Sequence, residues 1–463
     1  MTEPLATDLY ETFRADPLTR RQLSRVVVAA GIGSVIEWYD FLIYGTATAL
    51  YIGPTFFPSK DPLASTVAGF ATFFVGFVGR PIGAALFGHY GDRIGRKATL
   101  VFTLVLMGLS TALIGLVPGY AEIGIAGGVI LVLLRCVQGI ALGGEWAGAV
   151  LLTMEWGPRQ RKGLLAAVPQ SGIGIGLALG FLMLQESARL GVPHYWVWRL
   201  PMLASVLLVF VGLYVRLGIL ETPVFTRLLE ERLIEPRPLV TVARRAWRDV
   251  VAVWLARTSQ LVAFYIFTNF VLTYGVKFVH FKQPEVYFWV LVVSLVETLD
   301  VLFWGWLSDR VGRKRIIRAG MLALAAFTVP YFLLLDSRVA ALAFVAILVS
   351  YIVLDMQYSP FAALVTESFT GRIRYSGGSL GYHLGSLTGG GATPIIALAL
   401  LQSTGTSMSI ALFMIATVVV SLVAFAFVRD RTMQSIVVEY DRQPATLLPA
   451  VRGVGQVAGT WGT

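Results

Sequence analysis

The sequence reads GHYGDRIGRK at residues 88–97 and GWLSDRVGRK at residues 305–314. Six positions are identical in the two segments, at a constant offset of 217 residues. They are Gly88, Asp92, Arg93, Gly95, Arg96 and Lys97 in the first copy, and Gly305, Asp309, Arg310, Gly312, Arg313 and Lys314 in the second. Such an internal repeat predicts a chain built from two related halves.

The composition around this repeat is typical of an integral membrane protein. Of the 463 residues, 56% are hydrophobic and only 14% are charged, whereas soluble domains carry about 25% charged residues. Apolar runs of about 18 residues or more, each sufficient to cross a bilayer core of roughly 30 Å, recur along the chain. We predict twelve membrane spans, at residues 24–51, 64–89, 96–117, 122–151, 163–187, 196–217, 250–280, 285–308, 314–335, 338–367, 374–401 and 405–428.

Each copy of the repeat joins the second and third spans of its half, and a polar segment separates the sixth span from the seventh. We therefore predict an all-α integral membrane fold of two pseudo-symmetric six-helix bundles. The predicted parts are an N-terminal segment (1–23), a first bundle (24–217), a connector (218–249), a second bundle (250–430) and a tail (431–463). About 28 of the 37 Lys and Arg residues fall on the side of the termini, which predicts a multi-pass protein of the cell membrane with both termini cytoplasmic.

The composition also argues against several other classes of protein. The single cysteine, Cys136, excludes an internal disulfide framework, and the four histidines do not have the spacing of metal ligands. The net charge of +10 reflects the cytoplasmic basic residues and does not indicate a nucleic-acid partner. Neither a nucleophile–base pair nor a metal cluster is apparent. We expect no enzymatic activity, no metal or cofactor, and a monomeric functional unit.

The repeated hairpin itself has readable chemistry. Gly88 and Gly95 allow close backbone approach, and Asp92 can engage basic groups or the N-terminus of a neighbouring helix. The basic residues of both copies remain in the cytoplasm and fix the orientation of the spans. The two copies, with the same glycine spacing, favour a cytoplasmic gate that responds to conformational change. A segment that acts only as a topology signal is the alternative.

Two acids lie in the middle of the first predicted span. Glu37 and Asp40 are at positions i and i+3, so we expect them to share a helix face and to point into one cavity. Ionisable residues inside the membrane are costly and therefore indicate function. Two nearby carboxylates that are partly desolvated cannot both ionise easily, so one of them can carry a proton. We favour Asp40 as the proton carrier, with Glu37 as the fixed partner of a cation.

Arg135 is the cation that we expect to meet these acids. Its span runs in the opposite direction, and it lies at a depth similar to that of Asp40. A buried Arg–carboxylate pair would be broken by protonation, and Arg135 would then be free to bind an anionic substrate. A static structural ion pair is the alternative.

Other polar residues at cavity depth are candidates for substrate binding. In an alignment of the two halves, Glu297 is at the position equivalent to Arg80, and Arg257 is at the position equivalent to Asp40. The two halves thus carry charges of opposite sign at two equivalent positions. For Arg257 a position at the membrane interface is an equal alternative. For Trp38 and Tyr39 packing is the stronger expectation than substrate stacking, as it is for Phe264 and Tyr358. The candidate set is Arg80, Arg257, Tyr39, Asn269, Glu297, Asp300, Asp355 and Gln357.

Taken together, the motifs of this chain resemble those of a known family. The doubled hairpin resembles the signature of the major facilitator superfamily, and the whole set, from about residue 22 to 430, is similar to its metabolite:proton symporter family. The segments that carry the resemblance are IEWYDFLIYGTATA (36–49), GRPIGAALFGHYGDRIGRK (79–97), RCVQGIALGGEW (135–146), WRLP (198–201), ETPVF (221–225) and RIRYSGGSLGYHLG (372–385). One departure is the pair Glu297 and Asp300, because the eighth span of related sequences usually has few acids.

The resemblance implies an alternating-access transporter that moves a small organic solute across the membrane with protons as the coupling ion. Organic acids, shikimate-like compounds and zwitterionic osmolytes are the substrates it implies. We expect an organic acid, with a zwitterionic osmolyte as one alternative and proton-antiporting export of amphipathic compounds as another. A membrane sensor without transport activity would need a signalling domain, and the 218–249 connector is too short for one.

Overall fold

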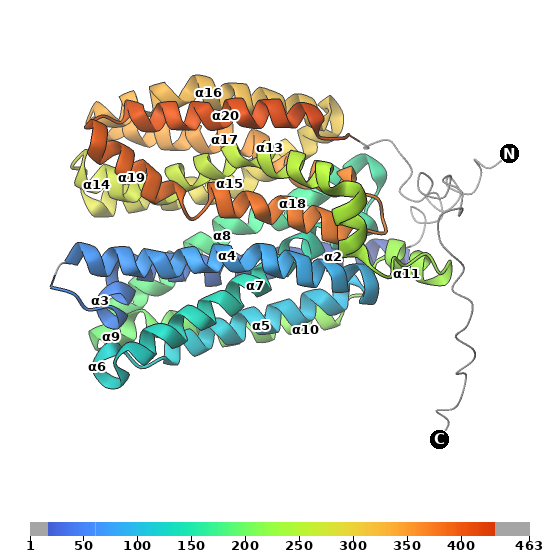
Figure 1. The fold of residues 1–463 in the computed structure, drawn as a ribbon, viewed down its shortest axis with the longest axis horizontal. Coiled ribbons are helices and arrows are strands. Elements are labelled where there is room, and N and C mark those ends of the chain that lie inside the picture. Colours follow the sequence, from blue (N-terminus) through green and yellow to red (C-terminus); the bar gives the residue numbers. More distant parts are fainter. Residues whose placement is uncertain (1–16, 61, 431–463) are drawn as a thin grey trace.

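The computed structural model describes residues 17–60 and 62–430 (Figure 1). The predicted tail 431–463 and most of the predicted segment 1–23 therefore lie outside the described residues. Every regular element in the described part is a helix. Within it, twelve helical segments are long and apolar enough to cross a membrane, as the hydropathy pattern predicts.

The first half consists of six long helices with short helical turns between them. The long helices are α2 (Pro17–Ala47), α4 (Pro62–Ile94), α5 (Arg96–Leu116), α7 (Ile125–Trp156), α8 (Lys162–Arg189) and α10 (Arg199–Leu217). The short elements are η1 (Thr48–Ile52), α3 (Gly53–Phe56), α6 (Tyr120–Ile123), η2 (Arg159–Arg161) and α9 (His194–Val197). Helix α11 (Pro223–Glu230) follows in the connector.

The second half repeats this plan. Its seventh span comprises α12 (Pro238–Thr241), η3 (Val242–Ala246), α13 (Trp247–Tyr265), η4 (Ile266–Phe270) and α14 (Val271–Lys277). The remaining spans are α15 (Gln283–Val311), α16 (Arg313–Asp336), α17 (Ala340–Ser368), α18 (Arg374–Gly389) with α19 (Thr393–Thr404), and α20 (Met408–Phe427). Figure 1 shows α16, α17 and α20 in one layer and α4, α5, α7 and α10 in the other.

Some helices extend beyond the spans predicted from hydropathy. The helical path of the seventh span begins at Pro238, inside the predicted connector 218–249, and α2 begins at Pro17. Apolar residues mark where the chain enters the hydrocarbon core, but a helix can begin earlier, in the polar region. The charged stretch ARRAWRD (243–249) is helical for this reason.

Glycines bring α4 and α7 into direct backbone contact. A Cβ atom added at Gly83 would lie 1.8 Å from the carbonyl oxygen of Ile140, and one added at Gly143 would lie 2.1 Å from the carbonyl oxygen of Arg80. Small residues are the usual means of close helix packing in membranes. This contact fixes the position of Arg80 relative to α7.

The two halves meet most extensively along two pairs of helices, α4 with α18 and α8 with α15, and α8 also packs on α17 and α7 on α17 and α18. The first glycine of each repeated segment lies at one of these contacts, because Gly88 packs on the backbone of Ser376 and Gly305 packs on Ala167. The later glycines, Gly95 and Gly312, have φ angles of 111° and 103°. Only glycine adopts such angles readily, so these residues form the sharp turns into α5 and α16.

Candidate functional site

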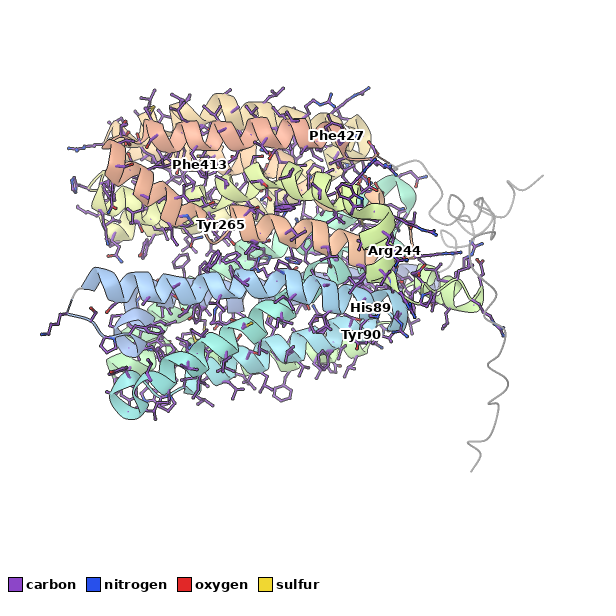
Figure 2. The ribbon with its side chains drawn as sticks, in the orientation of Figure 1. His89, Tyr90, Arg244, Tyr265, Phe413 and Phe427 are labelled. Atoms are coloured by element: carbon purple, nitrogen blue, oxygen red, sulfur yellow. The ribbon has the colours of Figure 1, made fainter. Side chains whose placement is uncertain are left out.

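A cavity between the two halves contains three charged residues. The empty space between its lining residues is about 380 Å³, a figure that includes open solvent. Its charged residues are Glu37 of α2, Arg80 of α4 and Arg257 of α13. The other lining residues are Trp38, Trp146, Ile173, Gln260, Leu261, Phe264, Tyr265, Tyr358, Tyr382 and His383. Figure 2 places Tyr265 within the second half, and His89 and Arg244 at the end of the molecule that carries the repeated hairpin.

Arg80 is held by aromatic rings and forms no ion pair within the described part of the chain, although it attracts the carboxylate of Glu37 in the same cavity. Its guanidinium carbon lies 4.3 Å from the ring centre of Phe41 and 4.8 Å from that of Phe77. The side chain is 5% exposed, and its Nε donates no hydrogen bond within the described part of the chain. Cation–π contacts stabilise an arginine without neutralising its charge. Arg80 is therefore a buried cation that an anion in the cavity could satisfy.

Arg257 is the matching cation of the other half. It donates hydrogen bonds to the carbonyl oxygen of Tyr382 (2.8 Å) and to Oγ of Ser386 (3.3 Å), and its guanidinium lies over the Tyr382 ring. The other face of this ring stacks on Trp146, with centroids 3.3 Å apart. Arg257 is buried, so the alternative of an arginine at the membrane interface is wrong. Like Arg80, it has no ion pair among the described residues.

Glu37 and Asp40 point in different directions, which contradicts the predicted shared cavity. Glu37 lines the cavity, where Arg80 is one of the cations that attract its carboxylate. Asp40 is fully buried inside the first half and accepts hydrogen bonds from Thr111 of α5 (3.1 Å) and Ser205 of α10. Residues i and i+3 differ by about 60° around a helix. At α2 this angle separates a cavity-facing side chain from one that faces the bundle interior.

The predicted ion pair between Asp40 and Arg135 is absent from the described structure. Arg135 donates a hydrogen bond to Gln138, Gln138 donates to the Thr111 hydroxyl (2.7 Å), and that hydroxyl donates to Asp40. The guanidinium carbon also lies 3.7 Å from the ring centre of Tyr44. The predicted partners are thus joined by a chain of hydrogen bonds, because neutral side chains of α5 and α7 fill the space between them.

The remaining candidates for substrate binding do not line this cavity. Tyr39 donates a hydrogen bond to the carbonyl oxygen of Pro201 (2.7 Å) within the first half, and Asn269 donates to its neighbour Thr268. Gln357 donates to the carbonyl oxygen of Gly320 on α16. Glu297, Asp300 and Asp355 are also absent from its lining. These side chains were predicted to bind substrate because of their expected depth in the membrane. Depth alone does not determine which face of a helix points toward the cavity.

The structure adds cavity residues that the sequence did not single out. His383 is buried, and neither of its ring nitrogens has a hydrogen-bond partner in the described part of the chain. Trp146 donates a hydrogen bond to Gln170 (2.8 Å) and stacks on Tyr382. Both lie in segments that carry the family resemblance, GGEW (143–146) and GYHLG (381–385). Of the aromatic residues for which packing was expected, Trp38, Phe264 and Tyr358 line the cavity.

A second site lies at the end of the molecule that carries the first hairpin. Asp92 accepts hydrogen bonds from the backbone N–H groups of Tyr375 (3.2 Å) and Ser376 (2.9 Å), and from the Ser376 hydroxyl (2.8 Å). These donors form the N-terminal turn of α18, where a carboxylate is favoured. Asp92 therefore joins the first half to the second.

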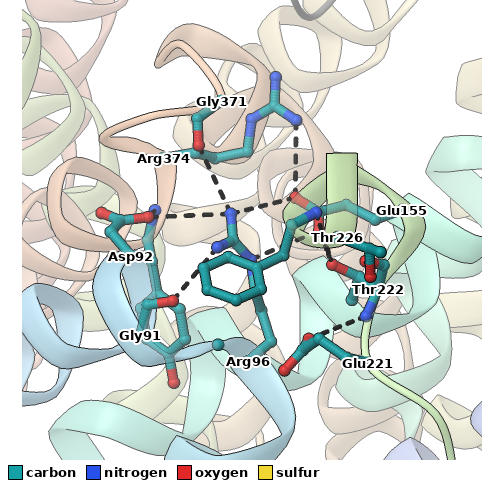
Figure 3. Close-up of polar contacts among 12 residues, drawn as sticks. Gly91, Asp92, Arg96, Glu155, Glu221, Thr222, Thr226, Gly371 and Arg374 are labelled. Atoms are coloured by element: carbon teal, nitrogen blue, oxygen red, sulfur yellow. Dashed lines mark hydrogen bonds and ion pairs between the residues drawn. The ribbon is translucent and has the colours of Figure 1, made fainter. Parts of the chain in front are cut away.

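Buried ion pairs surround this contact (Figure 3). Arg96 lies 3.8 Å from Asp92 and 3.4 Å from Glu155, and Glu155 also lies 3.9 Å from Arg374 of the second half. Arg93 and Lys97 lie outside the cluster, where Arg93 contacts His89 and the Lys97 ammonium donates to the Leu217 carbonyl oxygen.

The second hairpin makes the equivalent contact in the opposite direction. Asp309 accepts hydrogen bonds from the backbone N–H groups of Gly163 (2.7 Å) and Leu164 (2.9 Å), at the start of α8. Arg313 lies 3.5 Å from Asp309 and pairs with Glu367. Arg310 and Lys314 instead lie near the rings of Trp306 and Phe425. Asp92 of the first half and Asp309 of the second thus each accept hydrogen bonds from the start of a helix in the other half. These two contacts are called the aspartate latches below.

Comparison with known proteins places this architecture in a family. The family model described as Major Facilitator Superfamily matches residues 30–380 and 284–461. The chain is 34% identical over 420 residues to the Shikimate transporter of Escherichia coli (strain K12), covering 89% of this chain and 96% of that one. It is 36% identical over 447 residues to the Inner membrane metabolite transport protein YhjE of the same strain, covering 93% and 99%. In structure it matches the proton:xylose symporter XylE bound to 6-bromo-6-deoxy-D-glucose, with a TM-score of 0.72, 15% identity and coverage of 89% and 97%.

Proposed function

Because the chain belongs to the Major Facilitator Superfamily, whose relatives above are membrane transporters, we propose that it moves a small organic anion across the cell membrane together with protons. The observation that carries this proposal is the pair of buried arginines, Arg80 and Arg257, which line one cavity from opposite halves and form no ion pair among the described residues. Family membership agrees with the expectation that the chain is not an enzyme.

The charge of the cavity favours an anion over other solutes. Two arginines and one ionised Glu37 give the lining a net charge of +1, and protonation of Glu37 would raise it to +2. Arginine is well suited to hold a carboxylate, because its donors form a planar fork that can bind both oxygens. An organic acid is therefore the substrate class that we propose, in agreement with the name of the shikimate-transporting relative.

A zwitterionic osmolyte is the second candidate substrate. Glu37 lies beside Trp38, whose ring centre is 6.0 Å from that of Phe264. An acid next to aromatic rings could hold a quaternary ammonium group while Arg80 holds the carboxylate. An exporter of amphipathic compounds is disfavoured, since three buried charges in the lining would have to be desolvated against an apolar solute.

Proton coupling follows from the position of Glu37 near Arg80. A substrate carboxylate bound at Arg80 would repel an ionised Glu37, so a proton on Glu37 and an anion on Arg80 favour each other's binding. Linkage requires this effect to be reciprocal. We propose Glu37 as the proton carrier in the cavity. Asp40 is the alternative carrier, and it would act on the site indirectly, through Thr111, Gln138 and Arg135.

Alternating access would use the two aspartate latches. The contacts of Asp92 with α18 and of Asp309 with α8 close the cytoplasmic side, so release of the substrate into the cell requires both to break. We also propose that both termini are cytoplasmic and that one chain is the functional unit. No cofactor other than protons and no nucleic-acid partner enters this mechanism.

Uptake into proteoliposomes tests the function. A panel of organic acids and betaines is supplied outside, with an imposed pH gradient and with the membrane potential clamped. We expect accumulation of an organic acid that depends on the gradient. Uptake that ignores the gradient would overturn proton coupling, and uptake of betaines alone would overturn the choice of an anion.

Two variants then separate the candidate proton carriers. Glu37→Gln should lose gradient-driven accumulation but retain exchange of solute across the membrane, whereas Asp40→Asn should retain both activities in part. The reverse pattern would assign the proton to Asp40. Glu186→Gln is the matched control, because Glu186 is an exposed acid that pairs only with Arg189 in the described structure.

A further inference from the structure

Three carboxyl groups of the second half lie close together on α15 and α17. The Ser359 hydroxyl of α17 donates a hydrogen bond to the Val301 carbonyl oxygen of α15 (2.5 Å). These helices run in the same direction, so about one turn earlier on each of them Asp355 lies beside Glu297. The side chains of Asp300 and Asp355 also interact with each other. Glu297, Asp300 and Asp355 are named below the acid triad.

Two members of the acid triad, Glu297 and Asp355, are buried and lack the partners that buried charges require. Asp355 is 0% exposed and Glu297 is 2% exposed. No N–H or O–H group of the described residues donates to either carboxylate oxygen of Asp355 or to Oε1 of Glu297. Asp300 accepts one hydrogen bond, from the indole N–H of Trp304 (3.0 Å). Buried charges are normally paired or hydrogen bonded. The oxygens without a donor therefore indicate that a bound proton or another ligand satisfies them.

The groups around the acid triad supply no positive charge. Tyr351 and Tyr358 of α17 are its titratable neighbours, and Tyr331 of α16 interacts with Tyr351. Arg257 of α13 interacts with Tyr358 and with no acid of the triad. Helices α8 and α14 also pack against α15, and their described residues contribute no charged group that acts on the triad.

We propose that Glu297, Asp300 and Asp355 form a proton-binding site in the second half, separate from Glu37 in the cavity. Three neighbouring carboxylates without a cation repel each other strongly in a medium of low dielectric constant. Shared protons remove this repulsion and supply the missing donors, because a neutral carboxyl group donates its O–H to a neighbouring carboxylate. In the described part of the chain no group of His, Cys, Asp or Glu has the geometry to hold a metal ion, so a proton fits the triad better than a metal.

Tyr358 connects this site with the substrate cavity. It lines the cavity, its hydroxyl has no hydrogen-bond partner among the described residues, and it interacts with both Glu297 and Arg257. A hydroxyl can accept a proton from one group while it donates its own to another. A proton released by the triad would reach the cavity through Tyr358 once a movement of its ring brings the hydroxyl into hydrogen-bonding contact with an acceptor on each side. If the protein transports an anion as proposed above, the triad adds a second proton to each transport cycle.

Infrared spectroscopy tests the site without any solute, so its outcome does not depend on the proposed substrate. Purified protein in lipid vesicles is titrated with acid and base, and the carbonyl band of neutral carboxyl groups is followed. We expect a band that is diminished in Glu297→Gln, Asp300→Asn and Asp355→Asn and unchanged in Asp336→Asn. Asp336 is the control, because it accepts hydrogen bonds from Tyr274 and Ser407 outside the triad. Asp355→Glu should keep the band.

Several results would overturn the proposal. A band that survives all three triad variants would place the neutral carboxyl elsewhere, as would a band lost in Asp336→Asn. A band abolished by sodium chloride but not by choline chloride at constant pH would make the triad a cation site. If Asp355→Asn does not fold, Asp300→Asn decides, since an asparagine oxygen can still accept the hydrogen bond of Trp304.

The proton-to-solute ratio then tests the role in transport. At a gradient of one pH unit, each coupled proton multiplies the accumulation of solute about tenfold. We expect Asp300→Asn to lower accumulation about tenfold, because the proton carried by Glu37 remains coupled. Equal accumulation by Asp300→Asn and the wild type would refute the second proton, while leaving coupling through Glu37 intact. Loss of gradient-driven uptake in the wild type would instead refute the proposed function alone.

Discussion

Replacement of Asp92 by asparagine should shift the protein toward the state that is open to the cytoplasm. Asp92 accepts three hydrogen bonds from the first turn of α18, which belongs to the other half. In the proposed transport cycle all three break when the halves separate at this end of the molecule. Asparagine keeps one acceptor oxygen but loses the charge, and its NH2 group faces donors.

The size of this shift can be worked from the three contacts. A hydrogen bond to a charged group contributes about 1.5–3 kcal/mol and a neutral one about 0.5–1.5 kcal/mol, so the variant loses about 1 kcal/mol per bond. The gross loss of about 3 kcal/mol is offset in part, because a neutral amide is cheaper to bury than a carboxylate. A net loss of about 2 kcal/mol corresponds to about a thirtyfold shift in the equilibrium between closed and open states.

Cysteine accessibility measures this equilibrium. Cys136 is replaced by alanine, and a reporter cysteine is placed at Ala167, which is buried against Gly305 at the other latch. Its labelling by a membrane-impermeant maleimide is followed in inverted vesicles, where the cytoplasmic face is outside. We expect Asp92→Asn to raise the labelling rate about thirtyfold over the same background.

Two controls show whether an increased labelling rate results from opening of the interface between the halves. A second reporter at Ala149, buried within the first half, should remain unlabelled, because labelling there would indicate unfolding. Asp309→Asn should raise labelling less than Asp92→Asn, since Asp309 accepts two backbone hydrogen bonds across the interface and no hydroxyl donor is seen there. An unchanged rate in both aspartate variants would refute the reasoning.

Three further variants test the packing and the cavity. Glu145→Gln breaks the buried pair with Arg216, and we expect the free energy of unfolding in detergent to fall by about 3 kcal/mol; an unchanged value would mean that the pair is not desolvated. Gly83→Ala introduces a Cβ 1.8 Å from a carbonyl oxygen and should cost about 1–3 kcal/mol, whereas Gly31→Ala, with its nearest neighbour at 3.8 Å, should leave the melting temperature unchanged or higher. Arg80→Gln should raise the KM for the transported organic acid about tenfold or more, because a charge-assisted hydrogen bond is lost; an unchanged KM would remove Arg80 from the site.

The hairpins show how far a sequence pattern can predict a tertiary contact. The repeat placed Asp92 and Asp309 at equivalent ends of equivalent helices, and a carboxylate near a helix N-terminus is a strong local preference. The prediction that Asp92 engages basic groups or a helix N-terminus is confirmed by its contacts with Arg96 and α18. Which helix it would meet was not predictable, because that depends on how the halves dock.

The two acids of the first span show what the sequence pattern does not predict, namely which side chains surround a buried residue. Their depth followed from hydropathy, and their cost in the membrane singled them out correctly as unusual. Their surroundings did not follow, because a rotation of about 60° between i and i+3 can place two side chains on opposite sides of a helix–helix boundary. Glu37 faces the cavity, whereas Asp40 meets Thr111 and Ser205.

The sequence by itself therefore determined the membrane class, the twelve spans and the two-fold repeat. Each of these depends on local hydrophobicity, on the distribution of charge or on direct self-similarity, and none needs a contact between distant residues. Only the tertiary structure decided which charged side chains share a cavity, since that depends on the rotation of each helix about its own axis. Packing sets this rotation, through close contacts such as that between Gly83 and Ile140. Packing thus placed Arg80 and Arg257 in the lining of one cavity, together with Tyr358, and left the acid triad outside that lining.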